Sequence, residues 1–262
     1  VIHREKPQVY AGFRNWLALS AGYAAELQAH HALCGWRRAA VAPNALLDPT
    51  VASSDRRELG SPIVFGFMGR LGHSKGIDTI LDAARLLHDR GVDFRLRIAG
   101  GNPPGTGPAR DSNAKADLWQ EEADARGLGA VVEFVGWIEP TAFLDRVHVF
   151  VSPSRSEPFG LVLIEAMARG CPVIATRTHG AVEILDDGRF GILVAIGDEL
   201  ALADAMAALA QDPARRNELG EAALARARCY GPDRVGPALI AALRELGAAV
   251  GESQSGFCTP TK

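Results

Sequence analysis

The chain has 262 residues, of which 47% are hydrophobic and 23% are charged, and its formal net charge is −3. This composition is that of a globular protein with a sizeable core, and it excludes an intrinsically disordered chain. The net charge of −3 gives no argument for a nucleic-acid or anionic-membrane partner, and we expect no nucleic acid.

Cysteine spacing and hydropathy narrow the class further. The four cysteines form no CxxC pair and no zinc-like spacing with histidine: Cys34, Cys171, Cys229 and Cys258. No apolar run reaches transmembrane length and no signal peptide is recognisable. We therefore expect a reduced, cytoplasmic protein without a metal, and leave open a peripheral association with the inner face of a membrane. Because the chain begins with Val1, we also expect a fragment or a processed piece.

Residues 1–48 predict two short strands around one helix. Asn15 to Leu19 and Arg38 to Ala42 are short apolar runs, and Ser20 is a good N-cap for a helix over Ala21 to Leu33. Residues 48–62 contain Asp, Pro, Ser, Arg and Gly without periodicity, so they predict a linker and a domain boundary.

From Pro62 onward, apolar runs typical of buried parallel strands alternate with amphipathic helices. The predicted strands are Ile63 to Met68, Phe94 to Ala99, Val131 to Val135, Val147 to Val151, Pro172 to Thr176 and Phe190 to Val194. The predicted helices are Ile77 to Arg90, Ala114 to Arg126, Pro140 to Arg146, Phe159 to Ala168, Ala181 to Leu185, Asp198 to Ala210, Ala214 to Cys229 and Asp233 to Leu246. Residues 102–112 predict a loop, and the polar tail from Gly251 predicts disorder.

This alternation predicts an α/β fold with right-handed βαβ units and a Rossmann-like, doubly wound, mostly parallel sheet. Such sheets bind ligands at the carboxyl ends of their strands. The loops to search are those that follow Met68, Ala99, Val135, Val151 and Ala175.

The loop and helix after the strand 147–151 carry two carboxylates, Glu157 and Glu165, eight positions apart. The helix start between them offers free N–H groups and a positive dipole end, which favour an anion. An extended ligand with a central anion and a hydroxyl-rich group at each end, such as a nucleotide diphosphate-sugar, fits this layout. A capped helix with two surface glutamates is the alternative interpretation of this stretch taken alone.

Two cations lie in the loop after the first strand of the regular part. Arg70 and Lys75 are flanked by glycines, and together they can bind a diphosphate. The spacing is not that of a P-loop, and a helix-start loop with a solvated Arg and Lys is the alternative. Glycines at 100, 101 and 136 end strands where a planar base can approach, or are ordinary turn residues, and His179 beside Gly180 is more often structural than catalytic.

Taken in order, these residues resemble the C-terminal half of a GT-B retaining glycosyltransferase, most closely family 4, the glycosyl transferases group 1. The resemblance covers roughly residues 60–230, and residues 15–48 are similar to the family's crossing between its two domains. The segments that carry it are Gly69-Arg70-Leu71, Lys75-Gly76, Val132 to Gly136, Pro153-Ser154, Glu157 to Gly160, Glu165 to Ala168, Gly170 to Ala175, and Gly180 with Glu183.

The resemblance implies transfer of a sugar from a nucleotide diphosphate-sugar to an acceptor hydroxyl, with retention by front-face attack and without a metal or other cofactor. It assigns the diphosphate to Arg70 and Lys75, and the donor sugar to Glu157, the first Glu of the family's E-x7-E motif; these three are the expected catalytic residues. The remaining expected donor-binding residues are Val135 near the base, Phe159, Gly160 and Leu161 through their backbone, and Glu165 on the ribose hydroxyls.

The chain departs from the family in one residue and in length. His179 replaces the first Gly of the family's Gly-Gly pair, which predicts an altered donor-sugar geometry there. Almost all of the N-terminal domain, the expected supplier of the acceptor pocket, is missing. We expect residues 1–48 to be its remnant with the crossing, 49–232 the donor-binding domain, 233–250 a crossing helix and 251–262 a disordered tail. The apolar face of that helix is then partly uncovered: Val235, Leu239, Ile240 and Leu243.

The sequence leaves the acceptor open: its hydroxyl can belong to a saccharide, a lipid-linked molecule or a small molecule. It also leaves open whether the missing half is an N-terminal domain or a partner chain. Two other functions also stay open. One is a non-catalytic donor-fold module that regulates or docks on another glycosyltransferase subunit. The other is a GT-B phosphorylase, since the missing half would select phosphate as the acceptor, whereas the E-x7-E motif argues against an epimerase.

Overall fold

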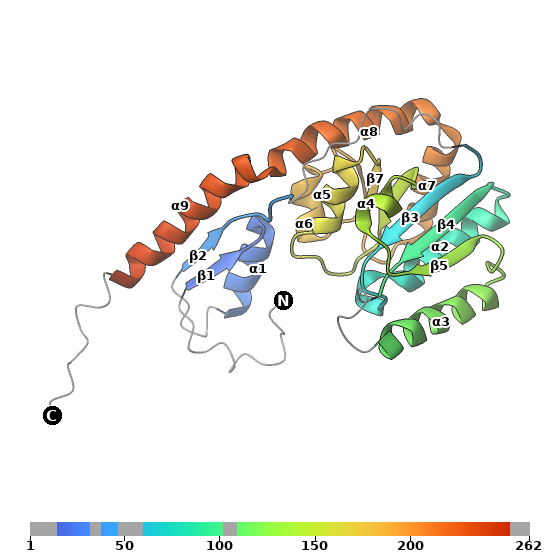
Figure 1. The fold of residues 1–262 in the computed structure, drawn as a ribbon, viewed down its shortest axis with the longest axis horizontal. Coiled ribbons are helices and arrows are strands. Elements are labelled where there is room, and N and C mark those ends of the chain that lie inside the picture. The colour runs from blue at the N-terminus through green and yellow to red at the C-terminus, as the bar shows by residue number, and fades with distance from the viewer. Residues whose placement is uncertain (1–14, 32–37, 47–59, 102–108, 252–262) are drawn as a thin grey trace.

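A six-stranded parallel sheet forms the centre of the computed structural model, which describes residues 15–31, 38–46, 60–101 and 109–251. The strands lie in the order β5-β4-β3-β6-β7-β8 (Figure 1). Their bounds are β3 Ile63–Met68, β4 Phe94–Ala99, β5 Val132–Gly136, β6 Val149–Ser152, β7 Val173–Thr176 and β8 Ile192–Val194.

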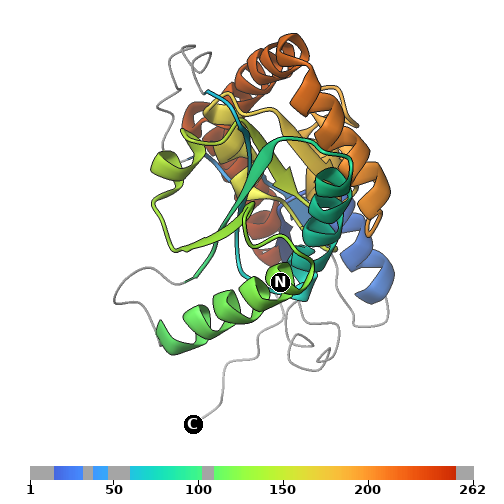
Figure 2. The ribbon, with the colours of Figure 1, turned by 90° about the vertical axis from the view of Figure 1, so that its right-hand side faces the viewer.

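Helices cover both faces of this sheet (Figure 2). One hydrophobic cluster joins Phe65 and Leu96 to α2 (Ile77–Asp89), α3 (Ala109–Ala125) and α7 (Glu199–Gln211). The other joins Phe150 and Val173 to α4 (Pro140–Leu144), α5 (Leu161–Ala168) and α6 (His179–Ile184). Helix α8 (Pro213–Ala227) contributes side chains to both clusters, so it lies at the seam between them.

The strand order confirms the doubly wound, Rossmann-like sheet. The chain starts this sheet at β3, moves outward to β4 and β5, and then returns to β6 before moving outward to β7 and β8. The sheet therefore reverses its winding between β3 and β6, which pair in parallel at Phe65–Val149 and Gly66–Phe150. Such a reversal opens a crevice at the carboxyl ends of the two strands, because the loops that follow them leave toward opposite faces.

The N-terminal segment forms a separate small unit. β1 (Asn15–Ala18) and β2 (Arg38–Val41) pair in parallel, α1 (Ala21–His31) connects them, and the long α9 (Pro232–Gly251) lies across them (Figure 1). Ala40, Ala42 and Ala242 form its small core. The apolar face of α9 is partly uncovered, as predicted: Ile240 and Leu243 are 51% and 52% exposed, whereas Val235 is buried.

Most predicted elements are found, and the main differences lie at helix starts. α3 begins at Ala109, so the loop prediction for 102–112 was wrong over 109–112; these residues lack apolar periodicity, and 102–108 lie outside the described residues. α5 begins at Leu161 rather than Phe159, because Gly160 takes a left-handed φ of 102°. α9 extends past Leu246 to Gly251. Much of the predicted linker (47–59) and the tail (252–262) lie outside the described residues.

Candidate functional site

The predicted cation and carboxylate loops meet at the point where the sheet reverses its winding. The loop after β3 contains a short 3-10 turn, η4 (His73–Lys75), and the loop after β6 leads to α5. The Nζ of Lys75 lies 2.5 Å from Oε2 of Glu157. Only 18% and 16% of the two side chains are exposed, so the pair is largely shielded from water. The structure thus brings together two residues that the sequence placed in one site.

Arg155 holds these two loops against each other. Its Nη1 and Nη2 donate to Oδ1 and Oδ2 of Asp78, in the first turn of α2, both at 2.7 Å. Nη1 also donates to the carbonyl of His73 at 2.7 Å, and the Arg155 N–H donates to the carbonyl of Ser74 at 2.9 Å. Burial by itself raises the pKa of Asp78, but the hydrogen bond and charge of Arg155 outweigh it and lower that pKa below its ordinary value. Sequence analysis missed this pair, whose only signal is an Asp in the first turn of a helix.

Two glycines allow backbone contacts that a side chain would block. Gly76 has a left-handed φ of 71°, and a Cβ there would overlap the carbonyl oxygen of Pro153. A Cβ at Gly180, the second residue of α6, would overlap the carbonyl oxygen of Phe159. The two loops and α6 are therefore packed backbone against backbone around Glu157.

Helix α5 begins at the edge of this packing. Gly160 is its N-cap residue, and no side chain caps it. Phe159 is buried and packs edge-to-face on Tyr230, with ring centroids 5.9 Å apart, whereas Leu161 is 37% exposed. The first N–H groups of this helix lack a side-chain acceptor, which suits an incoming anion.

Glu165 lies one turn further along α5 and is half-buried. Burial raises the pKa of this carboxyl, and the negative charge of Glu139 adds to the shift. No described residue forms a hydrogen bond or an ion pair with its carboxylate. A desolvated acceptor without a partner is costly in the free protein and available to a ligand hydroxyl.

The ends of β3, β4 and β5 form the rest of this edge. The N–H of Gly69 donates to Ala99, and that of Gly100 donates to Gly136, at 3.0 and 2.9 Å. Val135 is half-buried, and Arg70 is exposed with no hydrogen bond or ion pair from its side chain to any described residue. Arg70 therefore shares the edge with Lys75 but is not joined to the Lys75–Glu157 pair.

His179 turns toward α1. Its Nε2 lies 3.1 Å from Oε2 of Glu26, and a Cβ at Gly22 would stand only 2.9 Å from its Nδ1. The residue that departs from the family pattern is thus accommodated by a glycine on a neighbouring helix. The effect of this residue on donor-sugar geometry stays a prediction.

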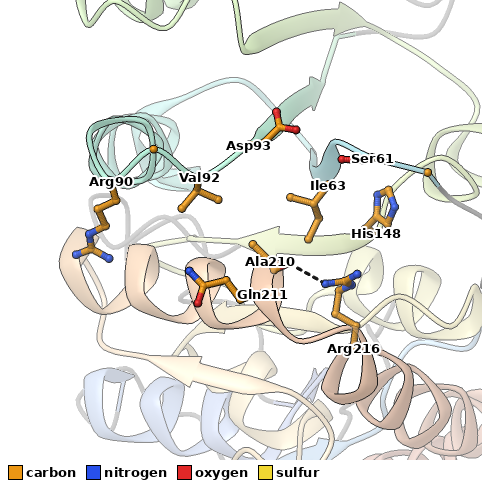
Figure 3. A pocket seen from close by; sticks show the side chains of 11 residues that line it. Ser61, Ile63, Arg90, Val92, Asp93, His148, Ala210, Gln211 and Arg216 are labelled. Atoms are coloured by element: carbon orange, nitrogen blue, oxygen red, sulfur yellow. Dashed lines mark hydrogen bonds between the residues drawn. The ribbon is translucent and has the colours of Figure 1, made fainter.

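The cavity drawn in Figure 3 lies at the amino-terminal ends of the strands, opposite the candidate site. It has a volume of about 500 Å³ and is lined by residues before β3, β4 and β6, including Ser61, Asp93 and His148. The Arg216 guanidinium there donates to the carbonyl of Ala210 at 3.1 Å, at the end of α7, where burial lowers the pKa of the arginine. Because parallel sheets bind ligands at the opposite edge, we do not assign the reaction to this cavity.

Within the described ranges, no group of three or more His, Cys, Asp or Glu residues is arranged to hold a metal ion. Among the helices that the structure describes, none is long and apolar enough to cross a membrane.

Comparisons with known proteins agree with this fold. A sequence profile of the family described as "Glycosyl transferases group 1" matches residues 52–226. The chain is 34% identical over 198 residues to the D-inositol 3-phosphate glycosyltransferase of Corynebacterium urealyticum, covering 73% of this chain and 46% of that protein. It is also similar to the solved sucrose-phosphate synthase of Thermosynechococcus elongatus, with a TM-score of 0.75 and 28% identity over 93% of this chain and 61% of that chain.

A further likeness concerns the fold alone. The Anabaena HepE structure, solved with UDP and glucose, has a TM-score of 0.71 and 20% identity, covering 98% of this chain and 68% of that chain. The chain spans about half the length of the curated relatives it matches, as in the 46% and 54% covered in two of them.

We expect Arg155→Lys to destabilise the chain by about 1 kcal/mol, because lysine cannot donate to both Asp78 oxygens and to His73 at once. The measurement is urea unfolding at neutral pH. The matched control is Arg177→Lys, whose pair with Asp187 is exposed on both sides and should contribute less than about 0.5 kcal/mol. Equal effects of the two substitutions would contradict the role given to Arg155.

We expect Glu165→Gln to stabilise the free chain at pH 7. A carboxyl whose folded pKa is raised costs stability as the pH rises through that pKa, because the unfolded chain ionises more readily. The gain should therefore vanish below about pH 4.5, the ordinary value, and grow toward neutrality. Unfolding curves at several pH values test this, with Glu121→Gln on the exposed side of α3 as control. Parallel wild-type and variant profiles would show that Glu165 is not destabilised by burial.

Proposed function

This chain belongs to the glycosyl transferases group 1 family, and from that premise we propose that it carries the donor-binding half of a retaining glycosyltransferase. The donor is a nucleotide diphosphate-sugar. The observation that supports this most directly is the Lys75–Glu157 pair, 2.5 Å apart where the sheet reverses its winding. A paired cation and carboxylate at this place suit a ligand that has a diphosphate and a sugar side by side.

The diphosphate is bound by positive groups of the chain itself. Lys75 supplies a point charge, Arg70 supplies a free planar guanidinium, and the uncapped start of α5 supplies N–H groups. Backbone groups of Phe159 and Leu161 complete this wall. The proposal therefore assigns no metal to charge neutralisation.

In this proposal the two glutamates bind the two ends of the donor, the sugar and the ribose. Glu157 accepts hydrogen bonds from the sugar hydroxyls beside Lys75. Glu165 stands about 6 Å further along the α5 axis than Leu161, and it accepts from the ribose hydroxyls. Val135, at the end of β5, lies near the base. This assignment gives the half-buried Glu165 carboxylate the partners that it lacks in the free chain.

Transfer proceeds on one face of the sugar. The acceptor oxygen bonds to the anomeric carbon on the side from which the diphosphate leaves, and the hydroxyl proton passes to an oxygen of the departing diphosphate. Lys75 and Arg70 stabilise the charge that develops there. The Glu157 carboxylate is held by its pair with Lys75, and in this proposal it orients the sugar rather than attacking the anomeric carbon.

The acceptor side belongs to another half of the protein. Several large apolar side chains of the N-terminal unit and α9 are exposed: Leu17, Val41, Ile240 and Leu243. We place the acceptor-side half against them, in a longer polypeptide or in a partner chain. Because the similarity to the D-inositol 3-phosphate glycosyltransferases covers about half of their length, it assigns no acceptor to this chain.

We expect the folded 262-residue chain to bind at least one of the UDP-, GDP- or ADP-sugars in isothermal titration. Glu165→Ala should weaken that binding by about 1–3 kcal/mol, through the lost ribose bonds. Glu121→Ala serves as the control for an exposed glutamate, and added EDTA should leave the wild-type affinity unchanged. Absence of heat with all three donors, from protein shown to be folded, would refute the proposal.

We expect Glu157→Ala to act on turnover in a protein that also contains the acceptor-side half. The rate constant kcat should fall by about 10²–10³-fold, as for the loss of one group that stabilises a transition state, while nucleoside diphosphate affinity is retained. Steady-state kinetics with the donor identified by titration tests this. Unchanged turnover would show that Glu157 does not have this role.

A further inference from the structure

The start of α1 contacts the candidate site, although it lies far from that site in the sequence. Ser20 is fully buried, and its Oγ donates a hydrogen bond to the carbonyl oxygen of Pro158 at 2.7 Å. The N–H of Ala21 donates to Oε2 of Glu183 at 2.8 Å. We call Ser20, Ala21 and Gly22 the α1 corner. Two of its residues thus form hydrogen bonds to the β6–α5 loop, which contains Glu157, and to α6, which packs against that loop.

The third residue of the corner fits α6 by shape. Gly22 lies against His179, and a Cβ at Gly22 would stand 2.9 Å from the imidazole Nδ1. The other ring nitrogen of His179 faces Glu26, one turn along α1, at 3.1 Å. The α1 corner therefore docks on α6 through a hydrogen bond and a close packing contact, and the Glu26–His179 contact adds to them one turn further along α1.

Ser20 has a second bond that ties it to its own helix. Its Oγ accepts the N–H of Tyr23 at 3.2 Å, which is an N-cap contact. Removal of this hydroxyl would leave the carbonyl of the half-buried Pro158 and a helix N–H without their partner. Because both bonds use one buried oxygen, the start of α1 and the site loop hold each other in place.

The contacts of the α1 corner converge on the backbone of Glu157 and its two successors. The Glu157 carbonyl accepts the N–H of Gly180 at 3.0 Å, the Pro158 carbonyl accepts the Ser20 hydroxyl, and the Phe159 carbonyl packs on Gly180. Glu183 lies one turn after Gly180 on α6. Each peptide that follows Glu157 is thus held by α6 or by the α1 corner.

We propose that Ser20 and Glu183 are positioning residues for Glu157. They hold the β6–α5 loop so that the Glu157 carboxylate stays beside Lys75 and faces the donor sugar. Neither residue touches the donor. This inference rests on the proposed function, because it assumes that Glu157 contacts the sugar.

The α1 corner should matter for the sugar and not for the nucleotide. Glu165 is carried by α5, whose Leu163, Ile164 and Met167 are fully buried in the core, so the core itself holds this helix. Lys75 is held through η4 and the Arg155–Asp78 pair, which do not involve α1. Loss of the corner therefore leaves Glu165, Lys75 and Arg70 in place, and with them the ribose contact and the side-chain contacts to the diphosphate, while it loosens the loop that presents Glu157.

The test is a pair of titrations on the 262-residue chain, one with a nucleoside diphosphate and one with its sugar. UDP, GDP and ADP are each compared with UDP-glucose, GDP-mannose and ADP-glucose, and the pair that wild type binds is then used. For Ser20→Ala we expect affinity for the diphosphate to stay within about twofold, and affinity for the diphosphate-sugar to fall about five- to tenfold. Ser156→Ala, in the same loop with an exposed side chain, is the matched control and should change neither.

Glu183 supplies a second variant in case Ser20→Ala does not fold. Glu183→Ala should produce the same selective loss, and Glu183→Gln should restore most of it, because an amide oxygen still accepts the Ala21 N–H. Equal loss for the diphosphate and for its sugar would overturn the inference. So would unchanged affinity in both Ser20→Ala and Glu183→Ala, or a wild type that binds the diphosphate and its sugar equally.

Hydrogen exchange separates this inference from the proposed function. In Ser20→Ala the Gly180 amide, which donates to Glu157, should exchange at least about fivefold faster than in wild type, with the amides of α2 unchanged. If wild type binds no nucleotide but this exchange is faster, the proposed function fails while the hold on the loop stands. If wild type binds the donor but the exchange is unchanged, the positioning role is wrong and the proposed function stands.

Discussion

The bidentate pair between Arg155 and Asp78 is the contact on which the site depends. The loops after β3 and β6 lead to α2 and α5, which cover opposite faces of the sheet, so the fold by itself directs them apart. Arg155 reverses this, because it starts in one loop and binds the first turn of the helix that follows the other. Gly76 then allows the two backbones to touch. Lys75 and Glu157 lie on the two loops that this pair joins, so the Arg155–Asp78 pair stabilises the arrangement in which their side chains meet.

The region around these two loops contains polar groups that lack partners within the chain. Glu165 is half-buried with a raised pKa, and Gly160 starts α5 in a left-handed conformation without a side-chain cap. The first feature costs stability in the free chain, because a partly desolvated carboxylate has no partner, and the second leaves the N–H groups at the start of α5 without a side-chain acceptor. The two clusters on the faces of the sheet, with residues such as Phe65 and Phe150 fully buried, offset these costs. The site therefore sits where the core ends, at the strand ends whose backbone groups are not covered by helices.

The sequence predicts those parts of the fold and of the candidate site that depend on residues close together in the chain. Apolar runs placed the strands of the main sheet, and strand ends placed Lys75 and Glu157 at one edge, because parallel strands end together. The Arg155–Asp78 pair was not predictable, since its partners are 77 positions apart and both residue types are ordinary at a surface. The same holds for Ser20 and Pro158, separated by 138 positions. The start of α3 was missed because its first residues are polar and carry no helical periodicity.

The N-terminal unit contacts the candidate site directly, which a predicted domain boundary near residue 48 does not suggest. The boundary suggests an appendage, yet Ser20 and Ala21 bond to the loop and the helix around Glu157, and the Leu46 N–H donates to Tyr230 beneath Phe159. The unit also exposes Leu17 and Val41, at 37% and 38%, on its two strands. Helix α1 connects these two strands. Because α1 also bonds to the loop that follows Glu157 and to α6, order in the N-terminal unit and order in that loop depend on the same short helix.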